Sequence, residues 1–434
     1  MGKIYIPNLK KQDMNTKKGI YFLVLLIFLS VSFVYSSSLN LVWWADYHGV
    51  GDDWAYSVAT DSLNNVIVTG VSYDLSYRGN YHTIKYDPNG TLIWEKSYNS
   101  GGNDTAWAVA ADSQNNVIVT GQSSSRYYTI KYDPNGNELW TTGTSGPFGT
   151  AFGVATDFQD NIIVAGTSGA NYYMIKYTPN GDVIWTKSHN AGGTDYAYDV
   201  TVDNQNNIIA TGTSSKGGFT RNYHTAKFDL NGNLIWSKEY GGAGWDEAWG
   251  VVTDSHNNVI VTGRAQSNHP NDYLNRFHTI KYDSNGNEIW AAGGIDGIIG
   301  TAWDIDSDSQ NNIIVTGGYV VSGKRNYYTI MYSSGGKILW NDIHPVGGLG
   351  EPWGVVADSQ NNIIVTGVSR ISGTDNYYTI KYQPEVPPTP PVTPEIVIFN
   401  PKELPMNHIS RILGIGDKRT IGGFLDEGNT SQIS

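Results

Sequence analysis

Short apolar runs that end at a glycine recur along most of the chain. The pattern Asn-(Val/Ile)-Ile-(Val/Ala)-(Thr/Ala)-Gly occurs seven times, at intervals of 45 to 54 residues. Its last positions are Gly70, Gly121, Gly166, Gly212, Gly263, Gly317 and Gly367. A nearly constant period in this range is typical of repeat proteins, in which each copy forms one supersecondary unit.

Each copy contains four short runs with strand character. In the second copy these are Ala106–Ala111, Val117–Ser123, Tyr127–Tyr132 and Glu138–Thr141. The segments between them read Asp-Ser-Gln-Asn-Asn (112–116) and Asp-Pro-Asn-Gly (133–136), and these residue types favour tight turns. Four antiparallel strands per repeat predict an all-β fold, a seven-bladed β-propeller.

The ends of the repeat region predict how the ring closes. The seventh copy runs into Gln383-Pro384 without a fourth strand. Leu41-Val42-Trp43 matches Leu92-Ile93-Trp94 at an offset of 51 residues, and Tyr47 matches Tyr98 at the same offset. We therefore expect the N-terminal strand to complete the last blade and leave no open edge between blades.

Spacing within the repeat predicts that the loops have constant length on one face of the propeller and variable length on the other. The distance from the first-strand Asp to the glycine is nine residues in every copy, as from Asp61 to Gly70. The gap between the second and third strands instead varies from eight to sixteen residues. Variable loops on a rigid scaffold usually carry binding, so the face that holds these loops is the candidate ligand face.

The sequence outside the repeats predicts export. Residues 1–38 contain five lysines, then the apolar run Ile20 to Val34, then small residues, which is the order of a secretory signal. The alternative is that this N-terminal segment is not cleaved and anchors the protein in the membrane. Residues 39–383 form the predicted propeller, residues 384–394 a Pro-rich linker, and residues 395–434 a short tail or truncated module.

Composition narrows the function classes. The chain has no cysteine, which excludes disulfides and thiol chemistry, and its net charge of −12 argues against nucleic-acid binding. Gly-x-Ser-x-Gly, His-Glu-x-x-His and phosphate-binding glycine motifs do not occur. The sequence therefore predicts no catalytic residues, although a site could still assemble from different blades.

The composite motif Asp-Ser-Gln-Asn-Asn-(Ile/Val)-Ile-Val-Thr-Gly, then Asn-Tyr-Tyr-Thr-Ile-Lys-Tyr-Asp-Pro-Asn-Gly, then Leu-Ile-Trp resembles the SBBP-type β-propeller repeat of bacterial and archaeal extracellular proteins. The resemblance covers roughly residues 41 to 383 and implies a propeller fold and export. It implies no shared activity. The hairpin Asp87-Pro88-Asn89-Gly90 with Trp94 also resembles that of quinoprotein propellers, which typically have eight blades.

Residues that recur in each blade are interpreted as structural. The fourth-strand tryptophans and the first-strand aromatics are expected to pack one blade against the next. The first-strand aspartates and third-strand lysines are expected to form polar contacts, with Met331 interrupting the lysine series. His82, His224 and His278 share one third-strand position, but equivalent positions on different blades are too far apart to bind one metal ion.

An irregular set gives the candidate ligand site. Three residues before the first-strand aromatic, four blades carry an aspartate and three carry a glycine. Such carboxylates near the channel mouth could bind Ca²⁺ or a cationic ligand, and the alternative is that they are turn residues. Neighbouring aromatic side chains could stack on sugar rings. The candidate ligand-binding residues are Asp53, Trp54, Asp104, Asp195, Tyr196, Trp245 and Asp246.

We therefore expect a noncatalytic secreted or cell-surface propeller, with no cofactor other than a conceivable Ca²⁺ ion. Its variable face would bind a glycan, a polymer or a surface protein. The alternative is a propeller enzyme, a lyase or hydrolase acting on polysaccharide, and quinoprotein dehydrogenase activity is less favoured. An enzyme would require nonrepeated acid or base side chains that converge at the channel mouth with a perturbed pKa.

Overall fold

The structure is a computed structural model. It describes residues 39–384 except 143–145, 216–219, 242–243, 267–273, 294–297, 322, 347 and 372. All described residues belong to the compact unit Ser37–Ser434. The predicted signal segment, the linker beyond residue 384 and the C-terminal tail lie outside the described residues. No helix that could span a membrane occurs in the described part of the chain.

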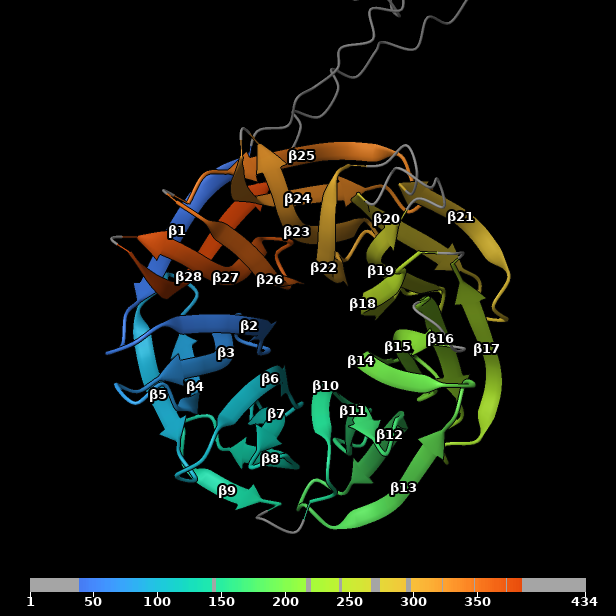
Figure 1. Cartoon of the computed structure of the whole chain (residues 1–434), viewed down its shortest axis with the longest axis horizontal. Coiled ribbons are helices and arrows are strands. Elements are labelled where there is room, and N and C mark those ends of the chain that lie inside the picture. Colours follow the sequence, from blue (N-terminus) through green and yellow to red (C-terminus); the bar gives the residue numbers. More distant parts are fainter. Residues whose placement is uncertain are drawn as a thin grey trace, which may run out of the picture. The chain divides into compact units, whose positions relative to one another are not determined.

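Seven four-stranded antiparallel sheets are arranged as blades around a central axis (Figure 1). In blades 1 to 6 the strands follow the chain from the innermost to the outermost. Blades 1 to 3 comprise β2 (Asp53–Thr60), β3 (Val66–Tyr73), β4 (Gly79–Tyr86), β5 (Leu92–Tyr98); β6 (Asp104–Ala111), β7 (Val117–Ser123), β8 (Arg126–Tyr132), β9 (Glu138–Thr141); and β10 (Thr150–Thr156), β11 (Ile162–Ser168), β12 (Asn171–Tyr177), β13 (Val183–His189).

Blades 4 to 6 continue the same order, and blade 7 combines the two ends of the described chain. Blades 4 to 6 comprise β14 (Thr194–Val202), β15 (Ile208–Ser215), β16 (Asn222–Phe228), β17 (Leu234–Tyr240); β18 (Glu247–Thr253), β19 (Val259–Gln266), β20 (Asn275–Tyr282), β21 (Glu288–Gly293); and β22 (Gly300–Ser307), β23 (Ile313–Val321), β24 (Lys324–Tyr332), β25 (Ile338–His344). Blade 7 comprises β26 (Gly350–Ala357), β27 (Ile363–Ile371), β28 (Thr374–Pro384) and β1 (Leu39–Tyr47). The predicted fold class and four strands per blade are confirmed.

The predicted closure is also confirmed. Strand β1 pairs antiparallel with β28 as the outermost strand of blade 7, and Figure 1 shows the blue β1 beside the orange β28. The Trp43 indole Nε1 donates to the Pro88 carbonyl of blade 1 at 3.0 Å. Trp94 makes the equivalent bond to Pro134 at 3.0 Å, so β1 substitutes for the missing fourth strand in contacts as well as in position. Strand β28 extends one residue into the predicted linker.

The turn between the first two strands of each blade follows from its sequence. In blade 1 Asp61 Oδ1 accepts the backbone N–H groups of Leu63 and Asn65, and Asn64 adopts a φ of 61°. Asn tolerates this left-handed conformation better than most residues. The Asn64 side-chain oxygen Oδ1 accepts the Ser359 N–H of blade 7 at 3.0 Å. Equivalent bonds join all seven blades into a circle, with Asp160 in place of Asn in blade 3.

The recurring lysine and aspartate pair within a blade. Lys85 Nζ lies 2.8 Å from Asp61 Oδ2, and both side chains are buried. The equivalent lysine–aspartate pair forms in five other blades, through Lys131, Lys176, Lys227, Lys281 and Lys381. Each ammonium also donates to a hairpin carbonyl of the next blade, so the pair links blades as well as strands.

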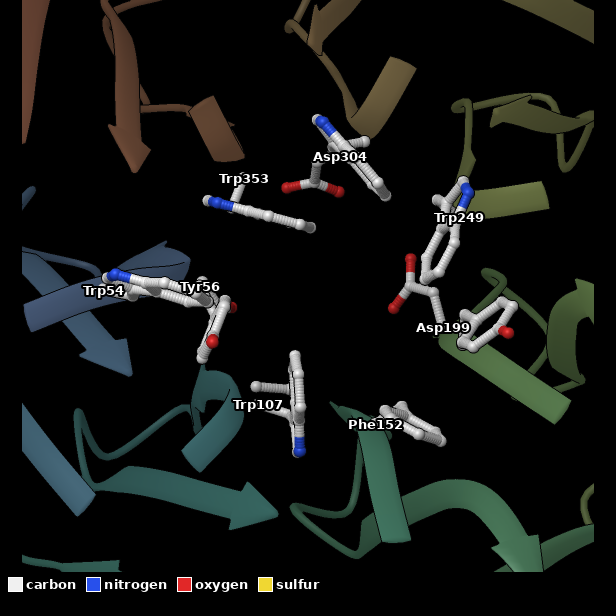
Figure 2. A pocket seen from close by; sticks show the side chains of 12 residues that line it. Trp54, Tyr56, Trp107, Phe152, Asp199, Trp249, Asp304 and Trp353 are labelled. Atoms are coloured by element: carbon white, nitrogen blue, oxygen red, sulfur yellow. The ribbon is translucent and has the colours of Figure 1, made fainter. Parts of the chain in front are cut away.

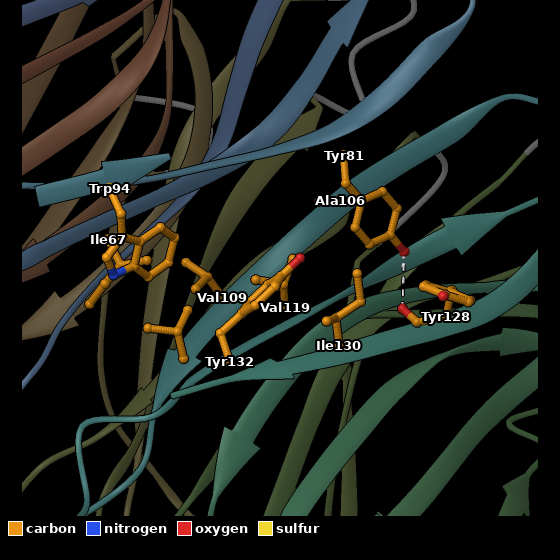
Figure 3. Packing of buried hydrophobic residues seen from close by; sticks show 10 residues of the cluster. Ile67, Tyr81, Trp94, Ala106, Val109, Val119, Tyr128, Ile130 and Tyr132 are labelled. Carbon is orange, nitrogen blue, oxygen red and sulfur yellow. Dashed lines mark hydrogen bonds between the residues drawn. The ribbon is translucent and has the colours of Figure 1, made fainter. Parts of the chain in front are cut away.

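The apolar core lies between blades. Between blades 1 and 2 it contains Ile67, Trp94, Val109 and Ile130, all buried (Figure 3). The Tyr81 hydroxyl crosses this boundary and donates to the Tyr128 carbonyl at 3.0 Å. Close packing of this kind at every boundary makes the ring a rigid scaffold for the residues at the channel.

Candidate ligand site at the channel mouth

A β-bulge in every innermost strand sets up the site. In blade 1 the β2–β3 register shifts between Ala55 and Ser57, so Tyr56 is the extra residue. The same shift occurs at the first-strand aromatic of every other blade. A bulge re-aims the inserted side chain, and Tyr56 and Ser57 therefore both line the channel although they are adjacent in sequence.

The bulged aromatics form a closed ring of contacts around the channel. Centroids of neighbouring rings lie 4.0 to 5.6 Å apart, from Tyr56 through each blade and back to Tyr56. They line a cavity of about 320 Å³ (Figure 2). The members of this ring are Tyr56, Trp107, Phe152, Tyr198, Trp249, Trp303 and Trp353. Their recurrence in every blade predicted that they pack between blades. They do contact one another across blades, but they also form the wall of a cavity.

The wall that faces the centre is mainly aromatic carbon. In Figure 2 the six-membered rings of Trp107 and Trp353 point toward the open centre, and their indole nitrogens lie on the far side. Ring edges rather than ring faces therefore border this part of the cavity. An aromatic edge carries the positive end of the ring quadrupole, so these two rings offer hydrophobic contact rather than a face for a cation.

Two carboxylates enter this apolar cavity. Asp199 on β14 and Asp304 on β22 follow the bulged aromatic, and Figure 2 shows both pointing toward the centre. Each binds its own blade and the next: Asp199 Oδ1 and Oδ2 accept the Val200 and Val251 N–H groups, both at 2.8 Å. Asp304 accepts the Ile305 and Val355 N–H groups, also at 2.8 Å.

Burial and neighbouring negative charges raise the pKa of both carboxyls. Loss of water raises the pKa of Asp199 to about 7, and the nearby negative charge of Asp306 adds to the rise. Burial, and then the charge of Asp199, raise the pKa of Asp304 well above its usual range. Burial also raises the pKa of Asp306, two residues further along β22, to about 6.

Sequence reasoning missed Asp199 and Asp304, although a signal was present. The residue after the bulged aromatic is small in the other five blades: Ser57, Ala108, Gly153, Gly250 and Gly354. Two aspartates at a position that otherwise holds Ser, Ala or Gly depart from the repeat. Because regular strand alternation places this residue on the opposite face from the aromatic, only knowledge of the bulge assigns it to the channel.

The four aspartates predicted as ligand residues lie elsewhere. Asp53, Asp104, Asp195 and Asp246 are at most 2 % exposed, and none is among the residues that line the cavity. Their carboxylates accept backbone N–H groups of nearby loops, as from Gly49 to Asp53 at 2.6 Å and from Ala191 to Asp195 at 2.8 Å. This geometry is that of the turn residues considered as the alternative interpretation.

The three predicted aromatic residues are at or near the mouth. Trp54 lines the cavity and donates from Nε1 to Asp375 Oδ2 at 3.0 Å. Tyr196 stacks on Tyr198 with ring centroids 5.9 Å apart. Trp245 is 42 % exposed and lies near the Arg221 and Arg264 guanidinium groups, 5.1 and 5.7 Å from its ring centroid.

A groove on the variable face adjoins the cavity. It consists of two depressions, of about 370 and 540 Å³, which share Arg325, Glu351 and Trp353. Glu351 is paired with Arg325 and accepts the Trp303 indole N–H at 2.9 Å. We call this surface the rim groove; its other residues include Trp54, Arg264, Arg370 and Asp375.

Ion pairs hold the arginines of the rim groove in fixed positions. Arg370 contacts both oxygens of Asp375, at 2.7 and 2.9 Å. Arg264 Nη2 lies 2.6 Å from Glu247 Oε2, and Arg221 binds the other oxygen of the same carboxylate. The guanidinium groups are thereby preorganised beside the groove.

The three equivalent histidines lie on blades 1, 4 and 5, each stacked on an outer-strand ring of the preceding blade. The ring partners are Tyr47 for His82, His189 for His224 and Tyr240 for His278. In the described part of the chain, no three His, Asp or Glu side chains are grouped so that they could hold a metal ion.

Comparison with known proteins gives the fold alone. No family model matches the chain, and no curated protein matches its sequence. The Dos1 propeller is similar in structure, with a TM-score of 0.52 and 11% identity over 80% of this chain and 95% of that chain. The polysaccharide lyase Uly1 gives a TM-score of 0.50 and 10% identity over 81% of this chain and 94% of that chain.

A gluconolactonase, XC5397 from Xanthomonas campestris, is a more distant match. It gives a TM-score of 0.40 and 11% identity over 78% of this chain and all of that chain. The similarity to the Dos1 propeller and to Uly1 supports the β-propeller architecture, and at these identities it transfers no site residue.

Proposed function

We propose that this chain is an exported binding propeller that holds a carbohydrate chain in the rim groove at the channel mouth. The observation that carries the proposal is the groove itself: Trp54 and Trp353 lie beside Arg–carboxylate pairs whose positions are fixed. Sugar rings present apolar C–H faces to aromatic side chains, and their hydroxyls bind planar carboxylate and guanidinium groups. An open groove across several blades suits an extended chain better than a small molecule.

The test is a glycan-array screen of the purified chain, followed by calorimetric titration with the best oligosaccharide. Arg325→Ala is the informative variant, because the Arg325 side chain is 55 % exposed and its loss should leave the fold intact. Arg78→Ala is the matched control, an exposed arginine on the same face that does not line the rim groove.

We expect Arg325→Ala to weaken binding about tenfold and Arg78→Ala to leave it unchanged. The absence of any glycan ligand, or an equal loss in both variants, would overturn the proposal. A protein that binds the same face and is displaced by neither glycan nor Arg325→Ala would identify a surface-protein partner instead.

Export is the second part of the proposal. Lysines precede an apolar run within residues 1–38, and this order supports recognition as a secretory signal. Expression of the full chain with separation of cell and medium fractions tests it. A mature protein that begins near residue 39 in the exported fraction supports cleavage, a membrane-bound full-length chain supports the anchor, and an unprocessed protein inside the cell contradicts export.

An enzyme acting on polysaccharide is a second candidate, favoured by the Asp199 carboxyl. Its pKa near 7 and its nonrepeated neighbour Asp304 fit the requirement stated for a general acid or base at the mouth. Incubation with polysaccharides, followed by assays for new reducing ends and unsaturated products, tests this candidate. Turnover abolished by Asp199→Asn would establish an enzyme; binding without turnover would leave the binding propeller.

A further inference from the structure

We propose that the central cavity, which adjoins the rim groove, binds a small primary amine: its ammonium lies between the Asp199 and Asp304 carboxylates, and its apolar body lies within the aromatic ring. This site goes beyond the proposed carbohydrate binding and does not depend on it.

The cavity combines an apolar wall with charge of one sign. The seven bulged aromatics, Trp54 and Ala108 supply most of the wall, and the charged side chains among its described lining residues are Asp199 and Asp304. Its volume of about 320 Å³ lies at the lower end of the range for small-molecule pockets. A ligand that matches these walls is compact, largely apolar and positively charged.

The two carboxylates retain acceptor capacity toward the cavity. Each of their four oxygens accepts one backbone N–H. A carboxylate oxygen has two lone-pair positions, so each oxygen can accept one further hydrogen bond. The backbone bonds fix the direction of both carboxylates, so an ammonium group with three N–H donors meets acceptors that are already oriented toward the cavity.

Electrostatics favours a cation over a neutral ligand. Besides burial, the charge of Asp306 raises the pKa of Asp199, and the charges of Asp199 and Asp306 raise the pKa of Asp304, so negative charge accumulates where Figure 2 shows both carboxylates pointing toward the centre. A bound ammonium relieves this repulsion, whereas a hydroxyl does not. Binding at neutral pH should therefore complete the ionisation of Asp199 and release protons.

Two other cations fit the cavity less well. Ca²⁺ takes six to eight oxygen ligands, and carbon atoms make up most of this wall. A quaternary ammonium is recognised by aromatic faces, but Trp107 and Trp353 direct their edges to the centre. It also has no N–H to donate to the carboxylates. A primary ammonium is the cation that uses both carboxylates and the apolar wall.

The experiment is calorimetric titration of the full chain with three ligands of similar shape: benzylamine, benzyl alcohol and benzyltrimethylammonium. We expect benzylamine to bind about 10- to 100-fold more tightly than either of the others, because charge-assisted hydrogen bonds are lost in both. Equal binding of benzyl alcohol, or no binding of benzylamine, would overturn the proposal.

Two variants separate this site from the rim groove. Asp199→Asn with Asp304→Asn should abolish the preference for benzylamine, while Arg325→Ala should weaken carbohydrate binding and leave benzylamine unaffected. Unchanged amine binding in the double variant, with a normal melting curve, would overturn the proposal. If the double variant does not fold, proton release on benzylamine binding to the unaltered protein tests the proposal instead.

Proton release is measured by repeating the benzylamine titration at pH 7 in two buffers of different ionisation enthalpy. The proposal predicts that the apparent binding enthalpy depends on the buffer in the direction of proton release. An enthalpy independent of buffer would contradict it, because the Asp199 and Asp304 carboxyls would then not engage the ammonium.

Discussion

Met331 on β24 lies opposite Trp340 on β25, at the boundary between the sixth and seventh blades. In the other six blades the residues at these positions are lysine and tryptophan, and both donate to one hairpin carbonyl of the next blade, as Lys85 and Trp94 do to Pro134. Blade 7 has no such hairpin, because its outer strand is β1 from the other end of the chain. Trp340 Nε1 accordingly has no partner among the described residues.

The exception in the lysine series therefore follows from the closure of the ring. Without the hairpin carbonyl, a lysine at position 331 would be buried with one polar partner fewer, and a methionine avoids that cost. Met331, which interrupts the lysine series in the sequence, is therefore explained by the way β1 completes blade 7.

Replacing Trp43 tests the closure. Trp43→Ala removes the bond to Pro88 and the packing of β1 against blade 1, and we expect a loss of about 2–4 kcal/mol of unfolding free energy. Trp44→Ala is the matched control, since that neighbouring side chain is 58 % exposed. Thermal melting followed by circular dichroism measures both. Equal melting temperatures for the two variants would mean that β1 does not close the ring.

The buried Lys85–Asp61 pair gives a second prediction. Lys85→Met should cost about 3–5 kcal/mol at neutral pH, because it leaves the buried Asp61 carboxylate without its cation. Adding Asp61→Asn removes the unpaired charge and should restore part of the loss. Urea unfolding at pH 7 gives both values. No difference between the single and double variants would show that the charge of Asp61 is not the cause.

The circle of turn contacts predicts a smaller effect. Asn64→Ala removes the acceptor for Ser359 and places alanine at a φ of 61°, so we expect a loss of about 1–2 kcal/mol. Asn64→Asp keeps an acceptor, as Asp160 does in blade 3, and should be nearly neutral. Chemical unfolding of the two variants side by side tests the difference, and an Asn64→Asp variant as unstable as Asn64→Ala would argue against the contact.

Two buried histidines predict acid sensitivity. Burial lowers the pKa of His82 and of His278 to about 4, below the value near 6.5 expected when unfolded. Between these values the unfolded chain binds more protons, so stability falls as the pH drops from about 6.5 to 4. The loss is on the order of 3 kcal/mol per histidine at most.

The measurement is the melting temperature between pH 4 and pH 7. Replacing both histidines by tyrosine, which the other four blades carry at this position, should flatten the curve. His48→Gln, a change at an exposed residue, is the control and should leave the curve unchanged. A curve that is equally steep in the double variant would assign the acid sensitivity to other groups.

The scaffold could be predicted from the sequence because its determinants repeat. Asp61 and Asn64 reappear in each turn, and the match of Trp43 with Trp94 located the closing strand. The side chains that line the channel could not be predicted, because the bulge at Tyr56 breaks the regular alternation that relates sequence position to strand face. Asp53 was placed near the channel by its position in the crossover, but its carboxylate turns back to bind the loop backbone.

The central claim is that ligands bind on the variable face at the channel mouth. Hydroxyl-radical footprinting with the oligosaccharide selected by the array tests it most directly, because tryptophans are distributed over the whole ring. We expect the ligand to protect Trp54 and Trp353 from oxidation and to leave the oxidation of Trp44, an exposed residue of the outer strand, unchanged. Protection of Trp44, without protection of Trp54 and Trp353, would contradict it.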